Sequence, residues 1–265
     1  MPAEYVAYYV AAAGLFGLLL GSFLNVCIYR LPRDLSVVAP RSFCPECGAP
    51  VAWYDNVPLW SYAMLRGRCR HCTKRIGRRY PLVELTTAAL FAIVAVRYGW
   101  TLPALKWMLF EAILVALFWT DFEEQILPDE FTIGGTLIGV IFAAFVKVPG
   151  VFGDLFFPQW KPIARSFFNA ALGAAMLSGP LWLLGEAYAR LRKREGLGFG
   201  DVKLMLLFGV FLGLENGLKA LLIGAIGGSI FGIIYLFATH RKAAETALPF
   251  GSFLCAGAAL VPLIG

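Results

Sequence analysis

Charged residues are scarce in this chain of 265 residues. They make up 15% of it, while hydrophobic residues make up 59% and the mean hydropathy is +0.72. A soluble globular domain carries about a quarter charged residues. The shortage of charge therefore excludes an ordinary soluble domain and indicates a helical membrane protein with one small polar insertion.

Long apolar runs follow one another along the chain, and a spanning helix needs about 17 to 25 residues. The runs lie near residues 5–29, 82–96, 102–120, 131–148, 167–188, 202–214, 218–238 and 250–264. They predict an all-α polytopic membrane protein with about eight transmembrane helices. Residues 149–162 hold prolines, glycines and aromatics but few charges, which fits either a loop or an interfacial segment.

No Lys or Arg precedes the first apolar run, and Glu4 is the only charged residue before it. A secretory signal peptide carries positive charge at that place, so residues 5–29 are predicted to be a membrane helix. The loops at 99–101 and 214–217 also lack Lys and Arg, whereas residues 30–79 carry ten of them against three acids. The positive-inside rule then predicts that the N-terminus lies outside and the polar insertion lies in the cytoplasm.

The remaining basic residues agree with that orientation. Those at 190–194, 203 and 241–242 fall on the cytoplasmic side, and so do Asp121 and Asp201. The formal net charge of +6 is explained by this orientation and by anionic lipid headgroups. We expect membrane lipids, and no nucleic acid, as partners of the basic surface.

Four of the six cysteines form two Cys-x2-Cys pairs in the insertion, Cys44 with Cys47 and Cys69 with Cys72, separated by 21 residues. This spacing is typical of a closed, tetrahedral, structural Zn²⁺ site. The segment is too short to build a core of its own, so the metal would supply its folding energy. Disulfides are disfavoured because the cytosol is reducing.

The other metal-binding side chains near or outside these pairs have simpler interpretations. His71 lies inside the second pair and is predicted to be an exposed neighbour rather than a ligand. Cys27 and Cys255 lie in apolar runs and are predicted to be ordinary buried thiols.

Two aspartates stand where apolar runs begin or end. Asp121 closes the third run, and Asp201 follows Gly198-Phe199-Gly200 at the start of another. Two carboxylates placed by membrane helices suggest a pair that shares a proton and activates water. The alternative is that each aspartate caps a helix. Asp201 and Asp129 fit a cap, whereas Asp121 does not, because a negative charge is disfavoured at a helix C-terminus.

Three more acids, Glu84, Glu111 and Glu186, lie in or near apolar runs. An acid inside a membrane is a functional hypothesis by default. Glu84 and Glu186 lie near the ends of their runs, where they can also simply reach water. Glu111 lies deeper, and no partner for it is evident in the sequence.

Small and polar residues in the first run predict close helix contact. Gly17 and Gly21 are spaced i, i+4, and small residues at that spacing let helices approach closely in lipid. Ser22 and Asn25 are interpreted as hydrogen-bonding residues between helices.

The order of these motifs resembles the type IV prepilin peptidases, which are membrane aspartic proteases. The resemblance runs through nearly the whole chain. It rests on Gly21-Ser22-Phe23-Leu24-Asn25-Val26, the two cysteine pairs with Asn56-Val57-Pro58-Leu59-Trp60-Ser61 between them, Tyr80-Pro81-Leu82-Val83-Glu84, Asp121 through Leu127-Pro128-Asp129, and Gly198-Phe199-Gly200-Asp201-Val202-Lys203. Each motif alone is weak, but their order and combination are highly specific.

The resemblance implies that Asp121 and Asp201 are the catalytic pair, with Gly198, Gly200, Asp129 and Lys203 as supporting residues. It implies a substrate, a type IV prepilin or a type II secretion pseudopilin, with a short basic leader and a hydrophobic helix. It also implies location in the bacterial inner membrane and N-methylation of the new N-terminus with S-adenosylmethionine. The sequence contains no motif that indicates where this cofactor binds.

The resulting interpretation divides the chain into a first transmembrane helix (1–29), a cytoplasmic zinc-binding domain (30–81) and the peptidase helices (82–265). One alternative is a peptidase without methyl transfer. Another, from a different class, is a membrane transporter or scaffold whose zinc loop docks a partner. A transporter is expected to show broken helices in two matching halves, and the sequence has no internal repeat of that kind.

Overall fold

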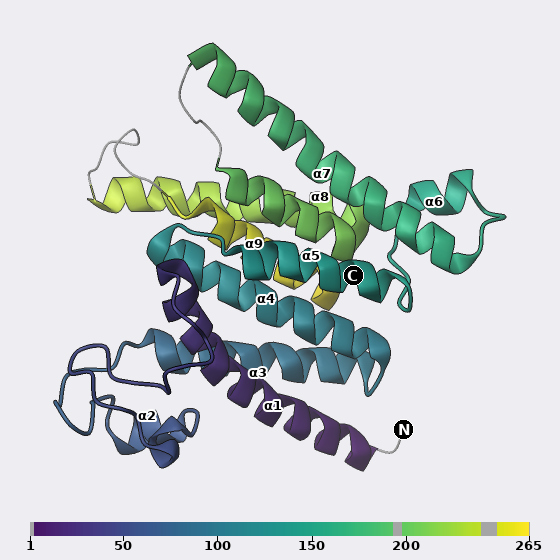
Figure 1. The fold of residues 1–265 in the computed structure, drawn as a ribbon. Coiled ribbons are helices and arrows are strands. Elements are labelled where there is room, and N and C mark those ends of the chain that lie inside the picture. Colours follow the sequence, from purple (N-terminus) through teal and green to yellow (C-terminus); the bar gives the residue numbers. More distant parts are fainter. Residues whose placement is uncertain (1–2, 193–197, 240–247, 265) are drawn as a thin grey trace. The chain divides into compact units, whose positions relative to one another are not determined.

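The computed structural model describes residues 3–192, 198–239 and 248–264, and nearly all of this part is helical (Figure 1). The chain forms two compact units, Met1–Ala116 and Leu117–Gly265. Lys193, Arg194, Arg241 and Lys242, which support the predicted orientation, lie outside the described residues.

The all-α polytopic membrane class is confirmed, but the number of spans is not. Among the described residues, five helices are long and apolar enough to cross a membrane. They are α1 (Ala3–Arg30), α3 (Arg79–Tyr98), α4 (Leu102–Glu124), α7 (Pro162–Arg192) and α8 (Phe199–Thr239). The helices α5 (Asp129–Ala143) and α9 (Phe250–Ile264) have 15 residues each, fewer than a full span needs.

Helix α8 covers two of the predicted runs, 202–214 and 218–238, and is interrupted at Gly213. The backbone there has φ 75° and ψ −177°, which is not helical. A side chain at this position would also meet the carbonyl oxygen of Pro149. Glycine is required at Gly213 because only glycine combines this backbone conformation with such a close approach.

In the first unit, α1 and α3 lie side by side, as the glycine spacing predicts (Figure 1). A Cβ atom added to Gly17 or Gly21 would lie 2.7 Å from Ala88 Cα or Glu84 Cα, respectively, so the two backbones almost touch. Asn25 Nδ2 donates a hydrogen bond to the Tyr80 carbonyl at the start of α3, at 3.0 Å. The predicted role of Asn25 between helices is therefore confirmed.

The segment between α1 and α3 contains only one short α-helix, α2 (Trp60–Met64), and two 3-10 turns, Leu31–Arg33 and Trp53–Asn56. Helix α1 ends at Arg30 and the chain continues as the 3-10 turn Leu31–Arg33, because Pro32 has no N–H to extend the α-helical hydrogen bonds. Arg30, at the end of α1, is buried and donates hydrogen bonds to the carbonyl groups of Ser36, Pro40 and Arg41. Arg30 thereby fixes the start of this segment.

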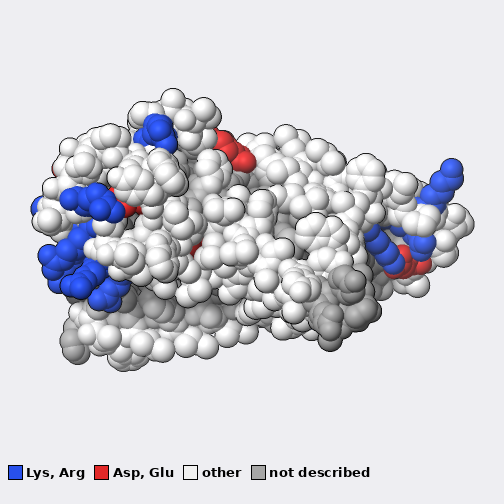
Figure 2. Space-filling model, turned by 90° about the horizontal axis from the view of Figure 1, so that it is seen from below, with Lys and Arg blue, Asp and Glu red and all other residues white. Residues whose placement is uncertain are grey.

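The same segment carries most of the positive charge of the first unit. Figure 2 shows Lys and Arg side chains gathered at the end of the unit where the segment lies. The exposed ones are Arg33, Arg41, Arg66, Arg68, Arg70, Lys74, Arg75 and Arg78. This charge distribution matches the one that the sequence predicts for the polar insertion.

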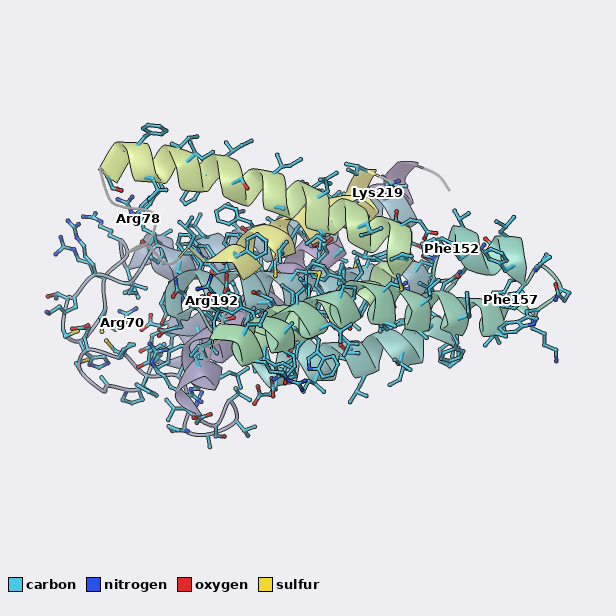
Figure 3. All side chains as sticks on the ribbon, turned by 90° about the horizontal axis from the view of Figure 1, so that it is seen from above. Arg70, Arg78, Phe152, Phe157, Arg192 and Lys219 are labelled. Atoms are coloured by element: carbon cyan, nitrogen blue, oxygen red, sulfur yellow. The ribbon has the colours of Figure 1, made fainter. Side chains whose placement is uncertain are left out.

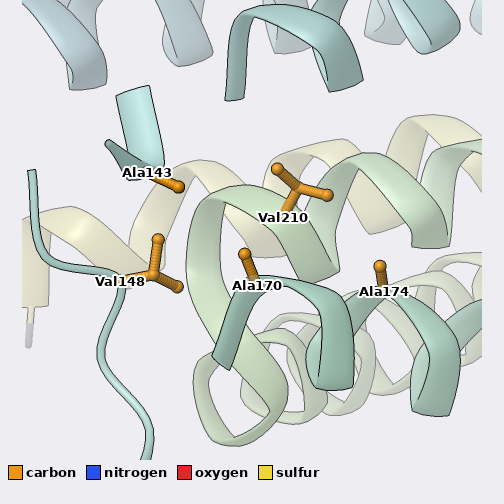
Figure 4. Packing of buried hydrophobic residues seen from close by; sticks show 5 residues of the cluster. All are labelled: Ala143, Val148, Ala170, Ala174 and Val210. Carbon is orange, nitrogen blue, oxygen red and sulfur yellow. The ribbon is translucent and has the colours of Figure 1, made fainter. Parts of the chain in front are cut away.

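In the second unit, α8 is the central helix and packs against α5, α7 and α9. Figure 4 shows a small core formed by Ala143, Val148, Ala170, Ala174 and Val210. Alanines and glycines here let the backbones of α7 and α8 come together: a Cβ atom on Gly173 would lie 2.7 Å from the Gly209 carbonyl oxygen. Van der Waals packing of this kind is what holds helices together in lipid.

Residues 149–162 contain a short helix, α6 (Val151–Phe156). Buried Asn169 on α7 accepts a hydrogen bond from the Gly153 N–H and donates to the Val148 carbonyl. Lys147 and Arg165 both bind Asp154, and hydrogen bonding by Lys147 followed by the charges of both bases holds the pKa of that carboxyl below its usual value. In Figure 3, Phe152 and Phe157 of this connection lie at the opposite end of the second unit from Arg192.

The tight contact between α7 and α8 yields a testable prediction. A methyl group at Gly209 would collide with the backbone of Gly173 and Ala174, whereas Gly227 on the same helix faces open space. We expect Gly209→Ala to destabilise the protein by about 1–3 kcal/mol. Gly227→Ala, the matched control, should leave stability unchanged or raise it slightly, since alanine favours helix by about 1 kcal/mol. Thermal unfolding in detergent measures both; equal midpoints for the two variants would contradict the packing described here.

Candidate active site and metal centre

The structure brings Asp121 and Asp201 together within the second unit. Asp121 lies in the last turn of α4 and Asp201 in the first turn of α8. The two carboxyl groups are close enough to interact electrostatically, and the buried thiol of Cys255 lies within electrostatic range of both. Only 7% of Asp121 is exposed, and Asp201 is partly buried. Two acids from different helices thus share one small, largely dry site.

Asp121 is held by Ser252, a residue that the sequence does not single out. Asp121 Oδ2 accepts a hydrogen bond from the Ser252 backbone N–H at 2.6 Å. The Ser252 hydroxyl lies 2.7 Å from the same oxygen and 2.9 Å from the Phe118 carbonyl, so its proton can be donated to either acceptor. Ser252 lies in the first turn of α9, where backbone N–H groups have no partner within the helix. The start of α9 therefore supplies two donors to Asp121.

Glycines leave room around both aspartates. A Cβ atom on Gly251 would lie only 3.0 Å from Asp121 Cγ, and one on Gly200 would lie 3.2 Å from Leu127 Cδ1. The Gly198 carbonyl accepts a hydrogen bond from the Asp201 N–H at 3.0 Å. Helix α8 begins at Phe199, so Asp201 lies inside the first turn and not at the cap position that the alternative interpretation requires.

Asp129 and Lys203 form an ion pair beside this site. Asp129 is the first residue of α5, and Lys203 Nζ lies 2.5 Å from its Oδ1. Lys203 also lies over the ring of Phe199, 5.0 Å from its centroid. The pair connects the start of α5 to the start of α8, which carries Asp201. Asp129 is more than half exposed, unlike Asp121.

The four cysteines of the insertion come together in the first unit. The Sγ atoms of Cys44, Cys47, Cys69 and Cys72 all lie within 4.8 Å of one another, and those of Cys44 and Cys72 are 3.9 Å apart. Tetrahedral zinc with Zn–S bonds of about 2.3 Å separates its sulfurs by about 3.8 Å, so the cluster is close to the size that zinc needs. His71 is exposed, as expected.

Backbone hydrogen bonds shape each half of the cluster. The N–H of Cys44 donates to the Ala49 carbonyl, and the N–H of Cys69 donates to the Lys74 carbonyl, both at 2.9 Å. These bonds fold each Cys-x2-Cys pair into a tight knuckle. Backbone N–H groups of Cys72 and then His71 hold the pKa of the Cys69 thiol at about 6. A lowered pKa favours the thiolate, which is the form that binds metal.

The remaining acids and cysteines of interest have varied surroundings. Glu186 accepts a hydrogen bond from Arg190 on the same helix. Glu111 is fully buried, and neither of its oxygens has a partner among the described residues. Glu84 is also buried, and its Oε2 accepts a hydrogen bond from the Leu59 N–H at 2.8 Å. Cys27 and Cys255 are buried thiols, as predicted.

Comparison with known proteins finds a family match in each half of the chain. The bacterial peptidase A24 N-terminal domain matches residues 15–98, and the type IV leader peptidase family matches residues 108–233. The four clustered cysteines fall in the first match, and both aspartates fall in the second. No solved structure matches the chain.

Three relatives are named prepilin leader peptidase/N-methyltransferase. The protein from Pseudomonas putida is 33% identical over 270 residues, covering 94% of this chain and 88% of the relative. That from Legionella pneumophila is 34% identical over 275 residues, covering 95% and 90%. That from Myxococcus xanthus is 39% identical over 230 residues, covering 87% of this chain and 64% of the relative.

The cysteine geometry yields a prediction about metal content. We expect elemental analysis of the purified protein to find one Zn²⁺ per chain, and Cys44→Ser to lose it because a closed structural site needs all four ligands. Cys27→Ala, which changes a cysteine outside the cluster, should keep its zinc. A native preparation that holds no zinc and has four freely alkylated cysteines would overturn the assignment.

Proposed function

Because the chain belongs to the type IV leader peptidase family, we propose that it is a membrane aspartic endopeptidase that removes the basic leader from type IV prepilins or type II secretion pseudopilins. We propose further that it methylates the new N-terminus. The observation that carries the peptidase assignment is the pair of carboxyl groups, Asp121 and Asp201, with Ser252 bound to one of them. Supporting roles are proposed for Gly198, Gly200, Asp129 and Lys203.

The geometry distributes the catalytic roles between the two aspartates. Two carboxyl groups held close together share one proton, because both cannot ionise cheaply. The two donors from Ser252 stabilise a carboxylate at Asp121, so Asp121 accepts a proton from the attacking water. Asp201 keeps the shared proton and donates it to the carbonyl oxygen or to the leaving amine. Water then attacks the scissile carbonyl directly, and no covalent bond forms between the enzyme and the substrate.

The surface next to the pair suits a basic leader. The turn between α4 and α5 is flanked by four exposed acids, Glu123 and Glu124 at the end of α4 and Asp129 and Glu130 at the start of α5, and residues 121–130 contain no Lys or Arg. This acidic turn would attract the basic leader, while the hydrophobic helix of the substrate stays among the apolar helices. Gly200 and Gly251 let the backbone pack closely against Leu127 and Asp121, respectively.

The remaining parts of the chain complete the proposal. Residues 30–81 form a cytoplasmic domain that zinc holds folded, between a first membrane helix at 1–29 and the peptidase helices at 82–265. The protein lies in the bacterial inner membrane, with its N-terminus outside and both aspartates on the cytoplasmic side. S-adenosylmethionine, when bound, supplies a methyl group that passes from its sulfonium sulfur to the N-terminal amine, which loses a proton.

The carboxyl pair yields a direct prediction. We expect Asp121→Asn or Asp201→Asn to abolish leader cleavage, because each change removes a group that must gain or hold a proton. Asp129→Asn, the matched control, should be much milder, because Asp129 pairs with Lys203 outside the carboxyl pair. Mass spectrometry of a prepilin incubated with each purified variant measures cleavage. Full cleavage by either Asp121→Asn or Asp201→Asn would contradict the assignment of these residues as the catalytic pair.

The same variants should separate the two activities. Methyl transfer needs no pair of carboxyl groups, so Asp201→Asn should still transfer a labelled methyl group to a synthetic mature N-terminus. If wild-type enzyme methylates that peptide and Asp201→Asn does not, the two sites are not independent. If wild-type enzyme transfers no methyl group, the protein is a peptidase only.

Ser252 yields a second prediction for the same reaction. Ser252→Ala removes the hydroxyl but keeps the backbone donor, so we expect cleavage to slow about tenfold, in line with about 1.5–3 kcal/mol for a hydrogen bond to a charged group. The loss should appear in kcat, with KM little changed, because Ser252 contacts Asp121 and not the substrate. Ser252→Thr, which keeps a hydroxyl, should restore most of the rate. Unchanged kcat in Ser252→Ala would show that the hydroxyl has no part in positioning Asp121.

A further inference from the structure

The first unit contains a cavity of about 330 Å³ that the peptidase mechanism does not use. Its lining comes from the end of α1, the cysteine-bearing segment and the start of α3. Polar lining residues include Ser22, Asn25, Asp55, Asn56 and Glu84, and aromatic lining residues include Tyr29, Phe43, Tyr62 and Tyr80. A cavity of this size with mixed apolar and polar walls is typical of small-molecule sites.

Glu84 gives the cavity a buried carboxyl group. Its exposed fraction is 7%, and its hydrogen-bond partners are the Leu59 N–H and the Ser22 hydroxyl. Among the described residues it has no ion-pair partner. A buried carboxylate without a cationic partner is costly, and a bound cation would offset that cost.

The basic residues that line the cavity are mostly engaged with groups other than Glu84. Arg30 is occupied by three backbone carbonyls, and Arg70 forms two hydrogen bonds with Asp55, at 2.7 and 2.6 Å. Lys74 lies 3.7 Å from Glu46. Arg75 is exposed. The interior of the cavity therefore favours a cation, and Arg75 can bind an anionic group of the same ligand.

Asn25 supplies a second, independent sign of a missing ligand. Its exposed fraction is 2%, and its Nδ2 donates to the carbonyls of Gly21 and Tyr80. Its Oδ1 is buried and has no hydrogen-bond partner among the described residues. A buried acceptor of this kind costs about 1–3 kcal/mol unless a donor reaches it. Within this lining, Glu84 thus lacks a cationic partner and Asn25 Oδ1 lacks a hydrogen-bond donor.

We propose that this cavity binds S-adenosylmethionine, with the Glu84 carboxylate facing the sulfonium group and Asn25 Oδ1 accepting a hydrogen bond from the adenine amino group. The proposal rests on the methyltransferase part of the proposed function. The ligand's chemistry matches the lining: its adenine suits the aromatic side chains, its carboxylate suits Arg75, and its sulfonium suits a buried carboxylate beside aromatic rings.

The charge on sulfur gives a sharp test, because S-adenosylhomocysteine is the same molecule without the methyl group and without that charge. Dissociation constants of both compounds would be measured by equilibrium dialysis on the full chain in lipid nanodiscs. We expect Glu84→Gln to weaken binding of S-adenosylmethionine about tenfold, the effect of one lost charged contact, and that of S-adenosylhomocysteine by less than threefold. Asp34→Asn, an acid-to-amide change in the same unit at a residue that does not line the cavity, should alter neither.

Two outcomes would overturn the proposal: no change in either dissociation constant of Glu84→Gln, or equal weakening of both ligands, which would show a packing effect instead of charge recognition. Zinc content near one per chain shows that the Glu84→Gln insertion has folded.

A measurement on the wild-type protein avoids the question of folding. Ultraviolet crosslinking with methyl-labelled S-adenosylmethionine should label peptides from residues 22–84, and label confined to residues 117–265 would overturn the assignment. If the wild-type protein binds no S-adenosylmethionine, both the ligand assigned to the cavity and the proposed methyltransferase activity are contradicted. Leader cleavage by the same preparation would still support the proposed peptidase activity. Binding by the wild type without an effect of Glu84→Gln would remove the cavity assignment alone.

Discussion

The constraint on which the rest of this structure depends is that apolar helices offer no partners to a buried charge. In a lipid environment every polar group must be satisfied by the protein itself. Asp121 meets this requirement through the backbone and the hydroxyl of Ser252, at 2.6 and 2.7 Å. The hydrogen bonds that make a buried carboxylate tolerable are the same ones that orient it for catalysis, so stability and chemistry depend on one contact.

Close helix packing in the second unit serves the same end. Gly209 and Gly173 let α8 lie against α7, and Gly251 lets the start of α9 reach Asp121. The non-helical backbone at Gly213 interrupts α8. At the far end of the unit, Asn169 satisfies the backbone of residues 148–153 in the same way as Ser252 satisfies Asp121. Small residues place the helices, and a few buried polar side chains lock the ends.

The sequence predicts the parts of this protein that depend on local chemistry. The two Cys-x2-Cys pairs predict the cysteine cluster because the spacing of the ligands along the chain is typical of a zinc site. The scarcity of charged residues predicts a membrane protein. Asp121 and Asp201 can be recognised because a carboxylate at the edge of an apolar run is costly unless it has a partner or a function. The close contact of α1 with α3 follows from Gly17 and Gly21, and the glycine motif before Asp201 marks the start of α8. None of these inferences needs a tertiary contact.

What the sequence does not predict depends on residues far apart in the chain. Ser252 is a small polar residue at the start of an apolar helix, which is a visible signal, but its partner lies 131 residues earlier. The count of eight spans is not confirmed, because hydropathy does not register helix length: α5 and α9 have 15 residues each. The cavity around Glu84 and Asn25 has no motif, since α1, α3 and the cysteine-bearing segment form it only when folded.

The central claim is that Asp121 and Asp201 act as one catalytic unit. Groups that act as a unit show strongly non-additive losses when they are removed together. The most direct measurement is therefore the residual rate of leader cleavage by the double variant Asp121→Asn/Asp201→Asn, compared with each single variant under the same conditions. The account predicts that the double variant is no slower than the slower single variant. A loss in the double variant equal to the product of the two single losses would contradict it.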